Sequence, residues 1–305
     1  MNTNINMTNQ SEQNTGSRWI DLHTHTTASD GTFTPDEVVK EAATLGLRAI
    51  AITDHDTVDG IEEALAAGEK YGITVVPGIE LSTEYAGVEI HVAGLFVDHT
   101  SQELIARAKA FREQRDGRNL KMIERLQKYG FQITEEALYE RFPDSVVARP
   151  HMARFLHETG QAKSVKDVFD KYIGDDCPCY VHREMITPMK AVSIIHAAGG
   201  TAILAHPCLY RKLNSETFTA MMNDLKESGL DGIEVRYSRN TVKEDRHYQE
   251  VADEYGLLYS GGSDFHGTNK PEIKIGSGTG NLYVPAEYLD RIIEYRSEER
   301  RVGKE

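Results

Sequence analysis

Residue types that bind metal ions follow short apolar stretches throughout this chain. His23 and His25 stand at the end of the apolar run 19–22, and residues i and i+2 of a β-strand point to the same face of the sheet. This spacing places two imidazoles side by side, as a metal ion requires. Residues of the same kind end or occupy later apolar runs: His55, Glu80, His91, His206, Asp264 and His266. The pattern predicts a polynuclear metal site at the mouth of a barrel and a metal-dependent hydrolase.

These side chains form a nitrogen and oxygen ligand set, which suits divalent Zn, Mn or Fe rather than a thiolate zinc site. A carboxylate such as Glu80 is able to bridge two metals, and a bridged pair about 3.5–4 Å apart can hold a hydroxide. Bound metal lowers the pKa of water towards about 7, which gives a nucleophile at neutral pH. The other metal contacts can bind the non-bridging oxygens of a phosphate and stabilise the charge of its transition state.

Alternating strands and helices must position these residues. The predicted strands are 19–25, 48–54, 73–80, 88–96, 201–206, 231–236 and 257–263. The predicted helices between them include one that begins at Thr34 and Pro35, 58–71, 188–198, 215–228 and 241–255. Thr34 and Glu37 would form a capping box with Pro35 at the first helical position. Repeated β-α units with ligands at the carboxyl ends of about seven strands predict a distorted α/β barrel.

Three segments fall outside this alternation. Residues 101–184 have helical patterns and no strand of comparable quality, and we interpret them as a helical insertion. Residues 1–17 are rich in Asn, Thr, Ser and Gln and have no apolar core, which predicts a disordered tail rather than a secretory signal. Residues 296–305 resemble the translation of a widely used sequencing adapter. We interpret them as an assembly artefact rather than as a charged helix end.

Composition restricts the class of protein. The 305 residues are 39% hydrophobic and 27% charged, as in ordinary soluble proteins, and no apolar run is long enough for a membrane span. Three cysteines give no disulfide framework, which predicts a reducing, cytoplasmic location. The net charge of −14, from 34 basic and 48 acidic residues, argues against generic nucleic-acid binding, because phosphate contacts supply non-specific affinity.

The ordered motifs identify a resemblance. His23-Thr24-His25, Ser29-Asp30-Gly31, Thr53-Asp54-His55-Asp56, Gly78-Ile79-Glu80, His91, Ala205-His206-Pro207 and Ser263-Asp264-Phe265-His266 resemble the motifs of the PHP (polymerase and histidinol phosphatase) superfamily. The resemblance implies a distorted (β/α)7 barrel formed by residues 18–100 and 185–290, with two to three divalent metal ions. It implies three metal sites: His23, His25, Glu80 and Asp264; Glu80, His91 and His206; and Asp30, His55 and His266.

The insertion narrows the resemblance to one subgroup. Val147-Ala148-Arg149-Pro150-His151 is similar to a segment of the 3′,5′-nucleotide bisphosphate phosphatases and of ribonuclease AM, a 5′→3′ exoribonuclease. In that subgroup the insertion covers the metal site, which implies phosphate contacts for Arg149 and His151. The guanidinium fork of Arg149 matches a phosphate in a bidentate manner. Arg236 and Arg211 are further candidates for phosphate contacts.

The expected activity is release of phosphate from a 3′,5′-bisphosphonucleotide or a nucleoside 5′-monophosphate, and 5′ ends of short RNA would use the same site. His206 and Asp264 are catalytic candidates that would influence the leaving-group proton. One alternative is a histidinol-phosphate phosphatase, and an alternative of another class is a non-catalytic metal-binding regulatory module. A metal-dependent amide hydrolase is disfavoured, because that class usually has a metal-bridging lysine at the end of a strand and this chain offers no candidate for it. We expect a nucleotide partner, no membrane and no obligate protein partner.

Two other groups have simpler interpretations. Asp54 and Asp56 flank a predicted ligand and are expected to form hydrogen bonds around it. A basic run covers one helical segment: Arg107, Lys109, Arg112, Arg115, Arg118 and Lys121. We interpret most of this run as a solvated helix face, and the alternative is that part of it guides a nucleotide.

Overall fold

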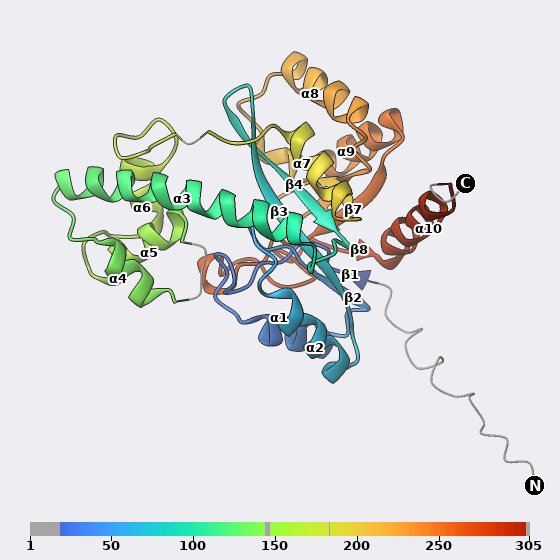
Figure 1. The fold of residues 1–305 in the computed structure, drawn as a ribbon, viewed down its shortest axis with the longest axis horizontal. Helices are drawn as coiled ribbons and strands as arrows, with labels where there is room; N and C mark the ends of the chain where they lie inside the picture. Colours follow the sequence, from blue (N-terminus) through green and yellow to red (C-terminus); the bar gives the residue numbers. More distant parts are fainter. Residues whose placement is uncertain (1–18, 144–146, 183, 303–305) are drawn as a thin grey trace, which may run out of the picture.

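The computed structural model describes residues 19–143, 147–182 and 184–302. Six strands form one sheet in the order β2-β3-β4-β5-β6-β7, and β1 and β8 form a separate pair. The strands of the larger sheet are β2 (Ala49–Ile52), β3 (Thr74–Tyr85), β4 (Val88–Leu95), β5 (Thr201–Leu204), β6 (Gly232–Tyr237) and β7 (Leu258–Gly262). The smaller pair is β1 (Trp19–Ile20) and β8 (Val284–Pro285). The predicted mixed α/β fold is confirmed (Figure 1), and the predicted tail, 1–17, lies outside the described residues.

The segment 21–25 lies between the two edge strands of the large sheet. The Asp21 amide donates to a carbonyl of β2, and the Leu22 amide donates to a carbonyl of β7. Strand β1 ends at Ile20, earlier than the predicted end at residue 25. The reason is that the backbone from Asp21 onward divides its hydrogen bonds between two neighbours instead of following one ladder.

Strands β3 and β4 form a long antiparallel hairpin. Pairing runs from Gly78 opposite Leu95 to Tyr85 opposite Val88. The two turn residues 86–87 have φ of 50° and 76°, as a type I′ turn requires. Strand β3 is longer than the predicted 73–80 because the hairpin continues its pairing. Glu80 therefore lies inside β3, where it is opposite Ala93, and His91 lies two residues from Ala93 on the paired strand β4.

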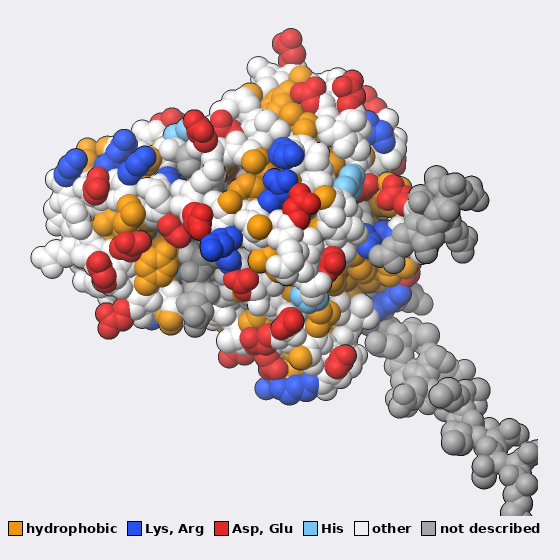
Figure 2. Space-filling model, in the orientation of Figure 1, with side chains coloured by type: hydrophobic (Ala, Val, Ile, Leu, Met, Phe, Trp, Pro, Cys, Tyr) orange, Lys and Arg blue, Asp and Glu red, His pale blue; other side chains and the backbone are white. Residues whose placement is uncertain are grey.

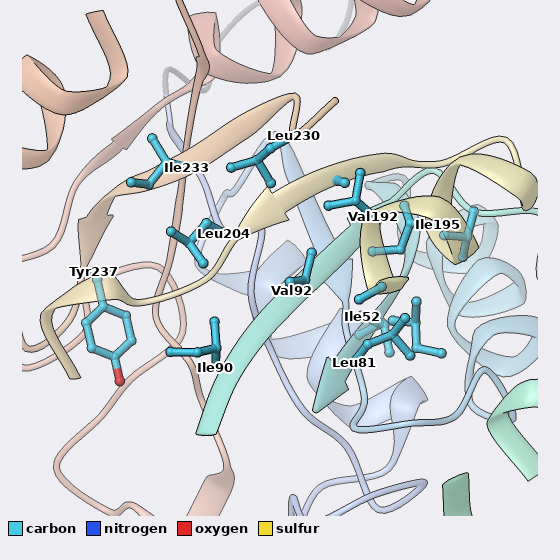
Figure 3. Packing of buried hydrophobic residues seen from close by; sticks show 14 of the residues in the cluster. Ile52, Leu81, Ile90, Val92, Val192, Ile195, Leu204, Leu230, Ile233 and Tyr237 are labelled. Atoms are coloured by element: carbon cyan, nitrogen blue, oxygen red, sulfur yellow. The ribbon is translucent and has the colours of Figure 1, made fainter. Parts of the chain in front are cut away.

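Helices cover the outer faces of the large sheet (Figure 1). They are α1 (Pro35–Thr44), α2 (Ile61–Tyr71), α7 (Pro188–Ala197), α8 (Ser215–Glu227), α9 (Val242–Tyr255) and α10 (Ala286–Val302). The predicted capping box at Thr34 is present, with Pro35 at the helix start. The core lies between the sheet and these helices, where Val192 and Ile195 of α7 pack with Val92 and Leu204 (Figure 3). This apolar packing fixes the strands whose ends carry the predicted ligands.

A helical segment separates β4 from β5. It contains α3 (Gln102–Lys128), α4 (Glu135–Arg141), α5 (Arg149–Glu158), α6 (Val165–Val168) and a π-helix (Phe169–Ile173). These elements share a core of their own that includes Met122, Leu138, Met152 and Val168. Figure 1 shows α4, α5 and α6 beside the sheet, whereas α3 extends across to it, and Leu104 and Ala108 of α3 belong to the main core. The described residues of this segment include no strand, as predicted. The domain boundaries 101–184 stay a prediction.

The remaining short elements are two 3₁₀ helices, Pro207–Leu209 and Gly267–Asn269. Residues 296–302 continue α10 as helix, and their interpretation as an artefact stays a prediction. None of the helices in the described part of the chain is long and apolar enough to cross a membrane.

Candidate metal centre

All nine predicted ligands meet at one end of the sheet. They fall into four groups in which one ligand atom of each member lies within 4.8 Å of the others. The groups are His25, Asp30, His55 and His266; His23, His25 and Asp264; His23, Glu80 and His206; and His55, Glu80 and His91. Strand ends far apart in the sequence therefore supply one continuous cluster.

The Glu80 carboxylate lies at the centre of this cluster and is fully buried. Its Oε2 atom lies 3.3 Å from the Nε2 atoms of both His23 and His25. Its Oε1 atom lies 3.0 Å from His91 Nδ1 and 2.9 Å from His206 Nε2. Each oxygen thus faces a different set of imidazoles, which is the arrangement that a carboxylate bridging two metal ions requires.

Two further carboxylates, those of Asp264 and Asp30, face imidazoles of the same cluster. Asp264 Oδ1 lies 3.4 Å from His25 Nε2 and 3.3 Å from His266 Nδ1. Asp30 Oδ1 lies 3.2 Å from His266 Nε2 and 3.9 Å from His55 Nε2. His266 therefore lies between two carboxylates, one on each ring nitrogen, and His25 joins the two halves of the cluster.

Several buried atoms of the cluster lack hydrogen-bond partners. These atoms are His25 Nδ1, Asp30 Oδ1, His55 Nδ1 and Glu80 Oε2. Buried polar atoms are almost always satisfied, because leaving one without a partner costs about 1–3 kcal/mol. In addition, His23 Nε2 and His25 Nε2 approach to 3.1 Å, so two ring nitrogens face the same point. The side chains present here fit divalent metal ions, which would satisfy these atoms.

Burial and charge together set the ionisation of the cluster. Burial raises the pKa of the Glu80 carboxyl, but the imidazoles of His23, His91 and His55 outweigh it and hold this pKa well below its usual range. Burial opposes the charged form of His91, yet Glu80 raises its pKa to about 10. At His55 burial prevails and lowers the pKa to about 3. The central carboxylate is therefore ionised, the form in which it binds cations.

Hydrogen bonds around the cluster hold its loops in place. Asp54 accepts from the amide and hydroxyl of Thr26 at 2.8 and 2.7 Å and from the Ser29 hydroxyl at 2.5 Å. Asp56 accepts from the Ser82 amide at 3.0 Å. The prediction that these two aspartates form hydrogen bonds beside a ligand is confirmed.

A small cavity of about 160 Å³ opens next to the cluster. Its lining includes three predicted ligands, Asp30, His55 and His91, and four further charged residues, Glu89, Arg115, Arg118 and Arg149. Arg115 and Arg118 come from α3 and are only 5% and 9% exposed. The interpretation of the basic run as a solvated face is wrong for these two residues. Their spacing of three on a helix, in register with apolar Met122, was the available signal.

Charged neighbours hold the guanidinium groups that line this cavity. Arg149 donates to Glu89 at 3.0 Å and to Asp175 at 2.8 Å, and it stacks over the Tyr180 ring at 5.2 Å. Arg115 forms a buried ion pair with Asp56. Arg149 and Arg115 are therefore fixed in position before any ligand arrives.

The other predicted phosphate contacts do not line this cavity. The buried His151 is not part of the lining of this cavity, and its Nδ1 accepts from the Ala148 amide at 3.0 Å at the start of α5. Arg211 lines a separate cavity of about 400 Å³ between α8 and α9. Arg236 forms an ion pair with Asp245 of α9. A β-bulge between residues 234 and 236 breaks the alternation of sides, which explains why Arg236 faces a helix.

Sequence patterns missed two partners of Asp264. Lys270 Nζ and the Tyr237 hydroxyl both donate to Asp264 Oδ2, each at 2.8 Å. They hold this oxygen so that Oδ1 faces the histidines. Tyr237 ends strand β6, where strand-end placement gave some signal, whereas Lys270 lies in an irregular loop that gave none.

Comparison with known proteins identifies the family. The PHP domain model matches residues 21–172. A 5′-3′ exoribonuclease of Haemophilus influenzae is 35% identical to this chain over 81% of its length and 89% of the relative. The chain belongs to the PHP domain family. The family predicted from the ordered motifs is therefore confirmed.

Two more similarities cover most of the PHP chain. A 3′,5′-nucleoside bisphosphate phosphatase of Chromobacterium violaceum is 34% identical over 81% of this chain and 87% of its own. A solved structure from Bifidobacterium adolescentis, assigned as a metal-dependent phosphoesterase, has a TM-score of 0.80 at 30% identity. It covers 90% of this chain and 95% of its own. These relatives support the predicted class of hydrolase for this PHP protein.

Proposed function

We propose that this protein is a metal-dependent phosphoesterase that removes a phosphate from a nucleotide. The favoured substrate is a 3′,5′-bisphosphonucleotide, followed by a nucleoside 5′-monophosphate and by the 5′ end of a short RNA. The observation that carries the proposal is the cavity whose lining combines three arginines with three residues of the ligand cluster. It offers cationic contacts for one phosphate beside the site where another would react. The names of the bisphosphate phosphatase and exoribonuclease relatives agree with this substrate class.

Two to three divalent ions, with Mn, Zn and Fe as candidates, would occupy the cluster. Glu80 would be shared by one site with His23, His25 and Asp264 and by a second with His91 and His206. Asp30, His55 and His266 would hold a third. When bound, such ions lower the pKa of water and stabilise the charge that develops on a phosphate. His206 and Asp264 remain the candidates to influence the leaving-group proton.

The arginine cavity would bind a phosphate group rather than a whole nucleotide. Its volume of about 160 Å³ is below the ~300–1,000 Å³ of pockets that enclose a complete small molecule. Arg149 is only 19% exposed in its side chain and already aligned by Glu89 and Asp175. A guanidinium held in this way binds phosphate through two parallel hydrogen bonds. The nucleoside would then extend from this cavity towards solvent.

Local charge matters because the protein as a whole repels anions. The net charge is −14, and acidic side chains gather on the surface over α1 and α2 (Figure 2). A substrate with several negative charges needs cationic groups at the site to overcome this field. The inward arginines meet that need.

The finer architecture is also a proposal. The segment 21–25 hydrogen-bonds to β2 on one side and β7 on the other, and we infer that it closes the sheet into the predicted distorted (β/α)7 barrel. The cytoplasmic location stays a prediction from the cysteine content.

The test is phosphate release by the Mn-loaded protein from 3′,5′-bisphosphoadenosine, AMP and histidinol phosphate, measured side by side. Metal content is determined in the same samples, and His23→Ala serves as the control. We expect fastest turnover of the bisphosphate, and loss of turnover in the variant. Preference for histidinol phosphate would overturn the nucleotide assignment. Full metal content without release from any substrate would favour the non-catalytic module.

A further inference from the structure

Glu234 of β6 touches two predicted metal ligands that come from different parts of the chain. Its carboxylate is buried, with the whole residue 1% exposed. Glu234 Oε1 lies 2.9 Å from His23 Nδ1, and Glu234 Oε2 accepts from the backbone amide of His206 at 2.6 Å. Both oxygens are thus engaged with ligand-bearing segments, and neither is directed at the cluster itself.

The contact with His23 determines which ring nitrogen is free. A carboxylate only accepts hydrogen bonds, so the facing Nδ1 atom of His23 carries the proton. With a proton on Nδ1, the ring has only Nε2 to offer to a metal ion, and this atom lies 3.1 Å from His25 Nε2 and 3.3 Å from Glu80 Oε2. A carboxylate behind a metal-binding imidazole fixes the ring and its tautomer in this manner.

The contact with His206 supports an unusual backbone. His206 has φ of 28° and ψ of 58°, in the left-handed region that residues other than glycine rarely adopt. The amide of this strained residue donates to Glu234. Its ring Nε2 lies 2.9 Å from Glu80 Oε1, so the residue with this uncommon backbone conformation also contacts the central carboxylate.

We propose that Glu234 is a positioning residue for the metal centre: it sets the tautomer of His23 and holds the backbone of His206, so that both imidazoles face Glu80. The inference rests on the metal sites of the proposed function and is independent of the substrate. It assigns a role in metal binding to a residue that offers no atom to a metal.

Glu234→Gln separates this role from simple packing. The amide has the size of the carboxylate but only one acceptor oxygen. If its NH₂ group faces His23, the ring must accept at Nδ1 and lose the free Nε2. If the NH₂ group faces the His206 amide, two donors meet. Either orientation disrupts one of the two ligands.

The same strand offers a matched control. Asp231 directly precedes the first residue of β6 and is also buried. It accepts from His196 Nε2 at 2.8 Å and from the Ala202 amide at 2.7 Å. Asp231→Asn therefore alters the same types of hydrogen bond, to a histidine and to the backbone of β5, and Asp231 belongs to none of the candidate metal groups. It reports what loss of such a carboxylate does to the fold alone.

The experiment measures Mn²⁺ binding by equilibrium dialysis and the tautomer of His23 by ¹⁵N NMR of the protein loaded with diamagnetic Zn²⁺. The His23 signals are assigned by their loss in His23→Gln. We expect the Nδ1–H tautomer in the unaltered protein, another tautomer or a mixture in Glu234→Gln, and about 10- to 100-fold weaker metal binding in that variant. Asp231→Asn should keep the metal affinity of the unaltered protein.

Glu234→Asp keeps the charge but shortens the side chain, so it cannot reach both partners, and it replaces Glu234→Gln if the latter does not fold. Unchanged metal affinity in the folded variant overturns the proposal, as does an equal loss in Asp231→Asn. Absence of nucleotide turnover bears only on the proposed function, because dialysis and NMR use no substrate.

Discussion

Replacement of Arg149 by methionine tests the substrate side of the site directly. The side chain is 19% exposed, and its partners Glu89 and Asp175 are 31% and 47% exposed. These carboxylates regain water when the guanidinium is removed, so each lost ion pair should cost at most about 1 kcal/mol of folding stability. A hydrogen bond to a charged group contributes about 1.5–3 kcal/mol. We therefore expect kcat/KM for 3′,5′-bisphosphoadenosine to fall about 10- to 150-fold.

The assay compares Arg149→Met with a surface control on the neighbouring helix. Arg141 of α4 pairs with Glu158 and is 52% exposed, so Arg141→Met removes an ion pair without touching the cavity. If Arg149 binds the phosphate that is not cleaved, the loss should be much smaller for AMP than for the bisphosphate. An equal loss for both substrates, or a loss matched by Arg141→Met, would refute the assignment of this cavity to a second phosphate.

Three further predictions concern stability and metal content. Mn²⁺ at a concentration of about 100 times its Kd should stabilise the folded protein by about 2.7 kcal/mol. The measurement is a higher Tm that a chelator reverses, and an unchanged Tm would contradict metal binding. Arg115→Met removes the guanidinium paired with the buried Asp56 and should lower the free energy of unfolding in urea by about 3–5 kcal/mol. A loss below about 1 kcal/mol would show that this ion pair does not stabilise the fold. The hydrogen bond with Asp231 raises the pKa of His196, so its stabilisation is complete below the unfolded pKa of about 6.5 and is lost as pH rises through the folded value. Unfolding measured from pH 5.5 to 9 should show this decline, and His196→Gln should remove it.

Strand-end placement explains why the ligand positions could be predicted. Alternation along a strand fixes the side of each residue, and parallel strands deliver their carboxyl ends to one edge of the sheet. His23, His25 and His206 follow from that rule. Glu80 and His91 satisfied it less well, because the β3–β4 hairpin places them inside strands. The cluster still includes them, since hairpin pairing brings the two strands side by side.

Local irregularities and long-range packing explain what the sequence did not reveal. Alternation would place Glu234 and Arg236 on one side of β6, but the bulge between them separates their directions. Glu234 contacts two predicted metal ligands, whereas Arg236 forms an ion pair with α9. Arg115 and Arg118 were equally ambiguous, because a basic helix face is ordinarily solvated. Their spacing in register with apolar Met122 was a weak signal, and the burial of both side chains in the structure shows that they point inward.

The position of the acidic groups decides how an acidic chain can act on an anionic substrate. Glu80, Asp30 and Asp264 face imidazoles, where divalent ions would more than neutralise them. Asp56, Glu89 and Asp175 are each paired with an arginine that lines the cavity. The carboxylates closest to the substrate therefore position cations instead of repelling phosphate. Further acidic residues lie at surfaces such as α1 and α2 (Figure 2). Physiological salt screens the charge of such residues over about 8–10 Å. Net charge alone is thus a poor guide to the ligands of this protein.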